Sequence, residues 1–145
     1  MTTRVLLVDD NARRSADRQG FLAAAGVEII AASDAHQAVE VIKSLHIDII
    51  CIDSEFVAHH GPWLGAFIKR QGSWAPVVLI VDDDRIPAHF EKHVDIVIDR
   101  ADFAITGRGL IRELMRGHIP FFKTWFEDWM NRAARSGRSQ SIRTY

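Results

Sequence analysis

The sequence has little of what marks secreted or membrane proteins. Its single cysteine, Cys51, cannot form a disulfide within the chain, which suits a reducing cytoplasm. The apolar run near the N-terminus is too short for a signal peptide, and no apolar run reaches the ~18 residues that a membrane-spanning helix requires. The net charge of −1 gives no reason to expect binding to nucleic acid. We therefore expect a cytoplasmic protein that binds neither nucleic acid nor membrane.

The sequence also lacks the short motifs that mark most enzymes. It contains no phosphate-binding glycine loop, no zinc-protease motif, no nucleophile elbow and no paired C-x-x-C. Cys51 lies inside an apolar run, where a small core residue is expected rather than a nucleophile. We expect the chain not to be an enzyme.

What the sequence does contain is an alternation of two patterns. Short runs rich in Val and Ile are typical of strands buried on both faces of a parallel sheet, and they span residues 4–8, 27–31, 48–52, 77–81 and 94–98. Helical periodicity or capping residues mark the segments 12–25, 34–45, 61–71 and 106–117. This order predicts an α/β domain with a doubly wound parallel sheet.

The connection between the fourth and fifth expected strands breaks this regular pattern. Residues 82–93 begin with three aspartates and contain Pro87, which would interrupt a helix. We expect a short or irregular element here. The aspartates are expected to form an acidic loop, with extension of a metal site as the alternative.

A further amphipathic helix is predicted after the α/β pattern. Pro120 suits its first turn, and its apolar face would carry Phe121, Phe122, Trp125, Phe126, Trp129 and Met130. Such a face favours a homodimer or docking surface, with packing against the same chain as the alternative. The domain organisation is then a main domain at 1–118, the aromatic helix at 119–135, and a polar, basic tail at 136–145.

Aspartates end two of the expected strands. Asp9 and Asp10 follow the first strand, and Asp53 follows the third. Ligands of open parallel sheets bind beyond the carboxyl ends of the strands, so neighbouring strands would bring these carboxylates into one pocket. Such a cluster favours magnesium (Mg²⁺), and one aspartate could attack a phosphoryl group. The alternative is that the strand ends are polar because they reach solvent.

These residues resemble the receiver domain of two-component response regulators. The resemblance covers roughly residues 3–116 and is carried by "RVLLVDDN" and "DIICID", with Gly61 eight residues after Asp53. It implies a flavodoxin-like, five-stranded parallel sheet of order 2-1-3-4-5, to which the aromatic helix is an addition. It also implies that Asp53 is the phosphoacceptor and that Asp9, Asp10 and Asp53 surround Mg²⁺. A sensor histidine kinase or phosphotransfer protein would act upstream, with a protein target downstream.

Three positions depart from the pattern of that family. Val81 replaces a Thr or Ser that donates a hydrogen bond to the phosphoryl group, and Ile96 replaces an aromatic residue. Asp99 replaces a lysine, which adds a carboxylate where the family has a cation. Arg100 would occupy the lysine position if the alignment with the family were shifted by one residue. Without such a shift Arg100 could still reach back toward the phosphoryl site, but the alternation of side chains along a strand disfavours this contact.

We therefore expect a stand-alone receiver-like signalling protein of a phosphorelay, with conventional switching in doubt. The alternative is a pseudo-receiver, a phosphorylation-independent interaction or dimerisation module. An Mg²⁺-dependent phosphohydrolase is a distant third hypothesis. We expect His59 and His60 to be exposed loop residues, with pocket lining or a transition-metal site as the alternatives, because adjacent side chains point to different sides.

Overall fold

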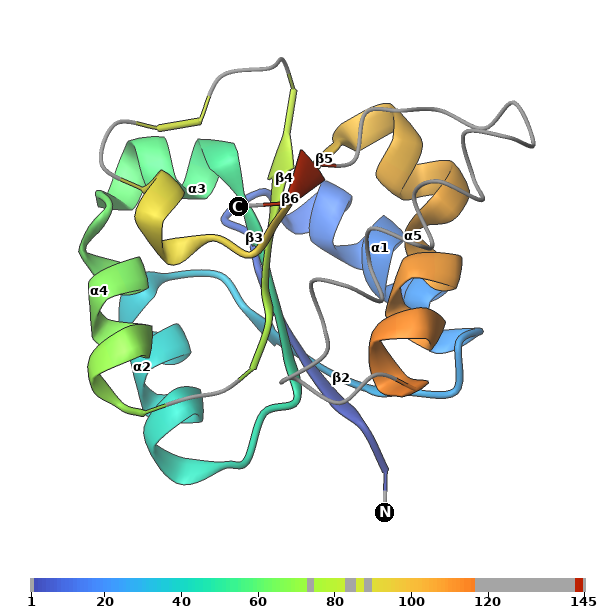
Figure 1. Cartoon of the computed structure of the whole chain (residues 1–145), viewed down its shortest axis with the longest axis horizontal. Coiled ribbons are helices and arrows are strands. Elements are labelled where there is room, and N and C mark those ends of the chain that lie inside the picture. Colours follow the sequence, from blue (N-terminus) through green and yellow to red (C-terminus); the bar gives the residue numbers. More distant parts are fainter. Residues whose placement is uncertain (1, 73–74, 83–85, 88–89, 117–142, 145) are drawn as a thin grey trace.

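The computed structural model describes residues 2–72, 75–82, 86–87, 90–116 and 143–144. They form a single sheet with helices on both of its faces, and Figure 1 shows the sheet nearly edge-on between these two layers. The predicted aromatic helix and its apolar residues, Phe121 to Met130, lie outside the described residues. In the part of the chain that the structure describes, no helix is both long and apolar enough to cross a membrane.

The sheet has the predicted parallel topology. Its parallel strands are β1 (Arg4–Val8), β2 (Glu28–Ala32), β3 (Ile49–Asp53), β4 (Val77–Val81) and β5 (Ile96–Asp99). Their order is β2-β1-β3-β4-β5, which confirms the predicted fold class. A two-residue strand, β6 (Arg143–Thr144), pairs antiparallel with β5. These two residues belong to the segment predicted as a tail, whose other residues lie outside the described chain.

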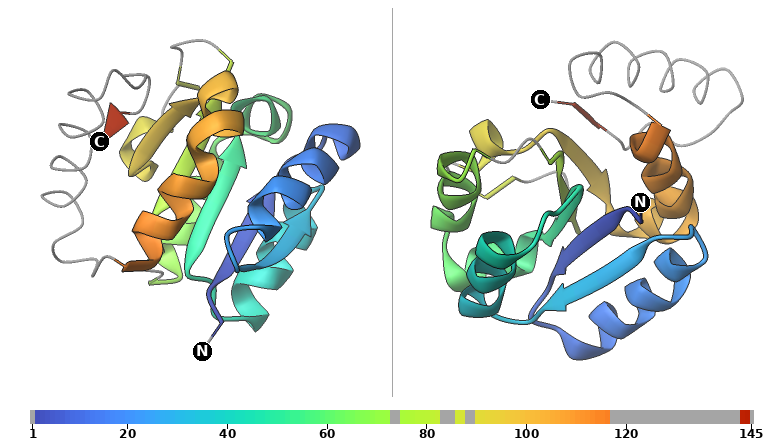
Figure 2. Two further views of the ribbon diagram at one scale, coloured as in Figure 1. Left: turned by 90° about the vertical axis from the view of Figure 1, so that its right-hand side faces the viewer. Right: turned by 90° about the horizontal axis from the view of Figure 1, so that it is seen from below.

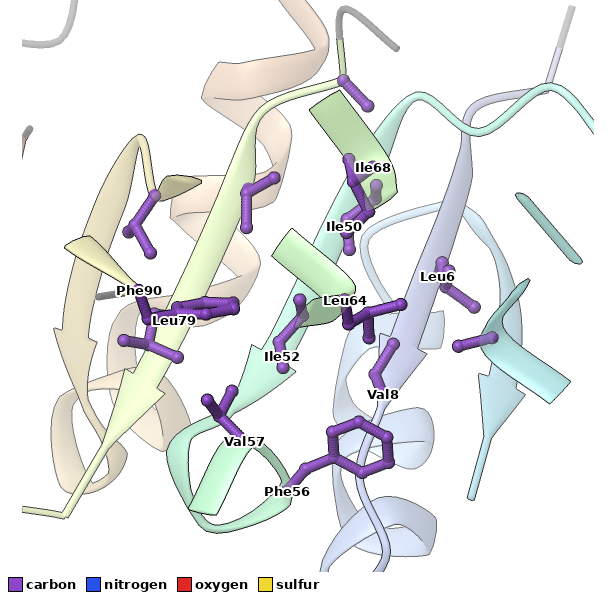
Figure 3. Packing of buried hydrophobic residues seen from close by; sticks show 14 of the residues in the cluster. Leu6, Val8, Ile50, Ile52, Phe56, Val57, Leu64, Ile68, Leu79 and Phe90 are labelled. Carbon is purple, nitrogen blue, oxygen red and sulfur yellow. The ribbon is translucent and has the colours of Figure 1, made fainter. Parts of the chain in front are cut away.

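The helices divide between the two faces of the sheet, as Figure 2 also shows. One face carries α1 (Ala12–Ala23) and α5 (Arg100–Arg116), and the other carries α2 (Ala35–Ser44), α3 (Ser54–His60) and α4 (Trp63–Arg70). Alternate residues of each strand face opposite layers, so Leu6 and Val8 join one core while Val5 and Leu7 join the other. Figure 3 shows the first core, where Phe56, Leu64 and Phe90 pack against the strands.

The prediction of one helix over 61–71 is incomplete. The chain forms α3 directly after β3 and then begins α4 at Trp63, with Gly61 at a φ of 86° between them. The Asp53 side chain caps α3 by accepting the N–H of Glu55 at 2.9 Å. The same aspartate that ends the strand therefore starts a helix.

The predicted start of α5 at Thr106 is wrong. The helix begins at Arg100, where Asp99 Oδ1 accepts the N–H of Ala101 at 2.8 Å. Thr106 lies within the helix, and its hydroxyl donates to the carbonyl of Asp102. An aspartate at the end of a strand is a good helix cap, so Asp99 was the signal for the true boundary.

An irregular connection between β4 and β5 is confirmed among its described residues. The regular element they form is a short 3-10 helix, η1 (Glu91–His93), which follows the buried Phe90. Both Phe90 and η1 lie against α4, where the backbone of Gly65 approaches His93 closely.

Candidate functional site

Asp9 and Asp53 meet at the carboxyl ends of β1 and β3. The two strands are direct neighbours, with Val8 paired to Ile52, so the residues that follow them come close together. Asp9 is 1% exposed and Asp53 is 0% exposed. Two buried carboxylates at one place require compensating positive charge, because an unpaired buried charge is strongly unfavourable.

Two arginines of α1 supply part of that positive charge. Arg14 Nη2 lies 2.7 Å from Asp9 Oδ1 and 3.3 Å from Asp53 Oδ1. Arg18 Nη1 lies 3.0 Å from Asp9 Oδ2 and 2.8 Å from Asp53 Oδ2. Each guanidinium group therefore bridges the same two carboxylates, one through their Oδ1 atoms and the other through their Oδ2 atoms.

A third arginine contacts Asp53 from the start of α5. Arg100 donates through Nη2 to Asp53 Oδ1 at 2.6 Å and through Nε to Asp53 Oδ2 at 3.1 Å, which is the two-point geometry of strong arginine–carboxylate pairs. The prediction that Arg100 would not reach back is wrong, because this residue is helical and strand alternation does not govern it.

Glu55 completes the cluster at its exposed side. Its Oε2 accepts from Arg14 Nη1 at 2.8 Å and from Arg100 Nη2 at 3.4 Å. The Glu55 side chain is 40% exposed, compared with 18% for Arg14 and 22% for Arg100. Three arginines thus face the carboxylates of Asp9, Asp53 and Glu55, and we call these six residues the arginine cluster. At its exposed edge Arg100 Nη1 also lies 3.6 Å from Asp82 Oδ2.

These contacts change the acidity of the groups involved. Burial alone would raise the pKa of Asp53, but hydrogen bonds from Arg100 and the backbone of Glu55, with the positive charge of Arg18, hold that pKa below its usual value. Hydrogen bonding to Asp9 raises the pKa of Arg14, and hydrogen bonding to Asp53 raises that of Arg100. These shifts favour the charged forms of Asp53, Arg14 and Arg100.

Asp10 contacts a pair of histidines. Its Oδ2 lies 2.7 Å from His59 Nδ1 and 3.3 Å from His60 Nε2, both at the end of α3. His59 is exposed, as expected, but both histidines lie on a helix and not in a loop, and His60 is half-buried with its ring stacked on Phe56. Burial would raise the pKa of Asp10, but the His59 hydrogen bond and the charges of both histidines lower it, while the same hydrogen bond raises the pKa of His59.

The positions that depart from the receiver pattern are part of the fold. Val81 is 2% exposed in the core beneath α2, α3 and α4, and Ile96 is fully buried in the opposite core. Asp99 caps α5 through its side chain. Cys51 is buried, and burial raises the pKa of its thiol to about 12, which supports a core role.

Sequence reasoning missed Arg14, Arg18 and Glu55. The available signal was the spacing of the two arginines, which lie four residues apart, one above the other on a helix that directly follows the Asp9–Asp10 pair. Arg18 also shares the buried face of α1 with Ser15 and Leu22, a position where a charge requires a partner. Among the described residues, no group of three or more His, Cys, Asp or Glu is arranged to hold a metal ion.

Comparison with known proteins identifies the fold but finds no relative by sequence. No protein-family model matches the chain, and no curated protein matches it in sequence. Solved structures do match. The chemotaxis response regulator CheY4 of Vibrio cholerae superposes with a TM-score of 0.67 at 18% identity, covering 79% of this chain and 99% of that one.

Two further solved structures give the same result. The response regulator TrrA of Thermotoga maritima, in complex with Mg²⁺ and beryllium fluoride, matches with a TM-score of 0.67 at 19% identity, over 78% of this chain and 99% of that one. The N-terminal domain of a response regulator/sensory box/GGDEF protein of Carboxydothermus hydrogenoformans matches at 0.66 and 21% identity, over 79% and 94%. The chain therefore has the fold of a response regulator receiver domain.

Proposed function

We propose that this chain is a signalling module with the receiver fold that acts through protein contacts and does not use phosphorylation of Asp53 as its switch. The observation that carries this proposal is the state of Asp53, whose two carboxylate oxygens are fully buried and held by arginines 14, 18 and 100. The proposal favours the pseudo-receiver alternative over a phosphorelay receiver.

Phosphoryl transfer to Asp53 would require a carboxylate oxygen to attack phosphorus. Oδ1 has Arg100, Arg14 and the N–H of Glu55 around it, and Oδ2 has Arg18 and Arg100. A hydrogen bond to a charged group contributes roughly 1.5–3 kcal/mol, so several must be lost before either oxygen is free. The lowered pKa of this carboxyl also makes it a weaker nucleophile.

The donor set also argues against Mg²⁺. This ion prefers oxygen ligands at about 2.0–2.1 Å and keeps several waters, whereas the Asp9 and Asp53 oxygens accept from guanidinium groups. An ion entering there would bring two further positive charges beside Arg14, Arg18 and Arg100. The residues therefore do not fit Mg²⁺ in this arrangement. In this respect the chain differs from TrrA, whose structure contains Mg²⁺.

The surroundings of the pocket add to this support. The side chain of Val81 has no hydrogen-bond donor, and it is buried in the core. Asp99 carries no positive charge, and its Oδ1 accepts the N–H of Ala101 in the first turn of α5. Neither residue would stabilise an added phosphoryl group.

Incubation with acetyl phosphate and Mg²⁺ tests this proposal directly. Intact-protein mass spectrometry at neutral pH is expected to show no phosphoryl adduct, while a phosphorylatable receiver domain in the same reaction is modified. The amide NMR spectrum is likewise expected to stay unchanged with beryllium fluoride and Mg²⁺. An adduct that appears in the wild-type protein and is lost in Asp53→Asn would return the chain to the phosphorelay class, with a histidine kinase or phosphotransfer protein as its partner.

We also propose that the aromatic residues at 119–135 mediate self-association. Their spacing would place Trp125 and Trp129 on one apolar helix face, and large aromatic side chains contribute strongly to interfaces. Light scattering of the full chain is expected to give the mass of a dimer, and Trp125→Glu is expected to give a monomer with an unchanged circular dichroism spectrum. A monomeric wild-type chain at all concentrations would contradict this proposal.

A further inference from the structure

The two α1 arginines of the arginine cluster carry the charge of a divalent cation. Arg14 and Arg18 each place one nitrogen between Asp9 and Asp53, at 2.7 to 3.3 Å from the oxygens. Together they supply two positive charges to the two most buried carboxylates of the described chain. A bound divalent ion in a carboxylate pocket supplies the same total charge.

The fold holds these guanidinium groups in place from several sides. Asn11 caps α1 by accepting the N–H of Arg14 at 3.0 Å, which fixes the first turn directly after Asp9 and Asp10. The guanidinium carbon of Arg18 lies 5.6 Å from the ring centre of Phe103, a residue of α5. Arg18 is itself only 5% exposed. The positive charge of Arg18 is therefore part of the packed interior between α1, α5 and the sheet, whereas Arg14 is partly exposed.

We propose that Arg14 and Arg18 replace a bound divalent cation, so that the chain supplies its own counter-ions and its pocket is independent of metal. This role rests on the proposed absence of a phosphoryl switch and explains how the receiver fold tolerates buried carboxylates without an ion. It assigns to Arg14 and Arg18 a positioning role toward Asp9 and Asp53. The same carboxylates would become a cation site once the arginines are removed.

Thermal unfolding of variants with and without Mg²⁺ tests this role. Arg14→Met and Arg18→Met keep much of the side-chain volume and remove the charge. The wild-type Tm is expected to be the same in EDTA and in about 10 mM Mg²⁺, since no site binds the ion. The double variant is expected to lose about 10 °C in EDTA, because buried Asp9 loses both of its arginine partners and Asp53 keeps only Arg100. Mg²⁺ is expected to restore about half of that loss, whereas NaCl of equal ionic strength restores none.

Two further variants keep the test decisive. If the double variant does not fold, Arg14→Met alone leaves Arg18 in place and is expected to show a smaller loss and a smaller recovery in Mg²⁺. Arg13→Met, an exposed neighbour on the same helix, is expected to change neither the Tm nor its response to Mg²⁺. Calorimetric titration of the folded variants with Mn²⁺ provides a second readout, with heat of binding expected in the arginine variants and none in the wild type.

The outcomes separate this role from the proposed function. A wild-type Tm that rises in Mg²⁺ would overturn the role, because the cation site would already be open. Arginine variants that lose stability without any response to Mg²⁺ or Mn²⁺ would also overturn it. Arg14 and Arg18 would then be ordinary ion-pair partners of the carboxylates. The proposed function fails on a different result, phosphorylation of wild-type Asp53, which none of these melting experiments measures.

Discussion

Asp53→Asn is expected to lower the free energy of unfolding by about 3–5 kcal/mol at pH 7, the usual loss when one partner of a buried ion pair is removed. The carboxylate of Asp53 is 0% exposed and lies within 3.3 Å of Arg14, Arg18 and Arg100. An asparagine fills the same volume but carries no charge, so Arg14 and Arg18 lose one of the two carboxylates that they bridge and Arg100 loses its two-point partner. Chemical denaturation with urea measures this difference.

The sign of this effect distinguishes the arginine cluster from a pocket that awaits a metal ion. Where carboxylates crowd together without a cation, removing one relieves repulsion, and the asparagine variant is the more stable protein. Here Asp9, Asp53 and Glu55 are matched by an equal number of arginines. An Asp53→Asn protein as stable as the wild type, or more stable, would therefore contradict the ion-pair description.

The same prediction has a definite pH dependence. The folded-state pKa of Asp53 is lowered below its unfolded value of about 3.9. Its contribution to stability is therefore fully present above about pH 4 and disappears as the pH falls through the folded-state pKa. The gap between wild type and Asp53→Asn is expected to be largest at neutral pH and to shrink below about pH 4.

Asp99→Asn is the matched control for this substitution. Asp99 is also an aspartate at the end of a strand, and its Oδ1 accepts the N–H of Ala101. Asparagine caps helices about as well as aspartate, so the control is expected to change stability by less than about 0.5 kcal/mol. A loss as large as that of Asp53→Asn would mean that any carboxylate at this edge of the sheet has the same effect.

The sheet was predictable because its strands are buried on both faces. Runs such as 49–52 and 77–81 are apolar at every position, which a helix or an edge strand rarely allows, and their order along the chain specifies parallel pairing. Helix boundaries were harder. Asp53 and Asp99 each end a strand and cap a helix, and the second role could not be seen while their side chains were assigned to a ligand pocket.

The acidic half of the site was predictable, and the basic half was not. Asp9 and Asp53 lie close together because they end neighbouring strands, so the order of the strands was enough to predict their contact. Arg14 and Arg18 come from a helix surface, where arginines are usually solvated, and only the packing of α1 turns them inward. Arg100 was considered, but its contact with Asp53 depends on a helix that starts at Arg100, and the prediction had placed that start at Thr106.

The histidine pair shows the same limit. His59 and His60 were expected in a loop, where adjacent side chains would point to different sides and have separate surroundings. On the last turn of a short helix they are about 100° apart, and Asp10 lies close enough to meet both. Local rules thus failed wherever the element type had been assigned incorrectly.

Gly65→Ala is expected to lower the free energy of unfolding by about 1–3 kcal/mol, although alanine is the better helix former. A Cβ atom at this position would lie 2.7 Å from His93 Cβ and 2.9 Å from Phe90 Cε2. The ring of Phe90 is fully buried, so it cannot move aside without opening the core. The helix α4 must then separate from η1, which urea denaturation would register as a lower midpoint.

Gly20→Ala is the control that isolates this close contact. Gly20 lies within α1, and a Cβ there would have no atom within 4 Å. The same substitution at this position is expected to stabilise the protein by about 0.5–1 kcal/mol, because it reduces the conformational freedom of the unfolded chain. Opposite signs at the two glycines would locate the effect at the contact between α4 and η1. If Gly65→Ala were as stable as Gly20→Ala, the connection between β4 and β5 would have to shift freely, which the burial of Phe90 argues against.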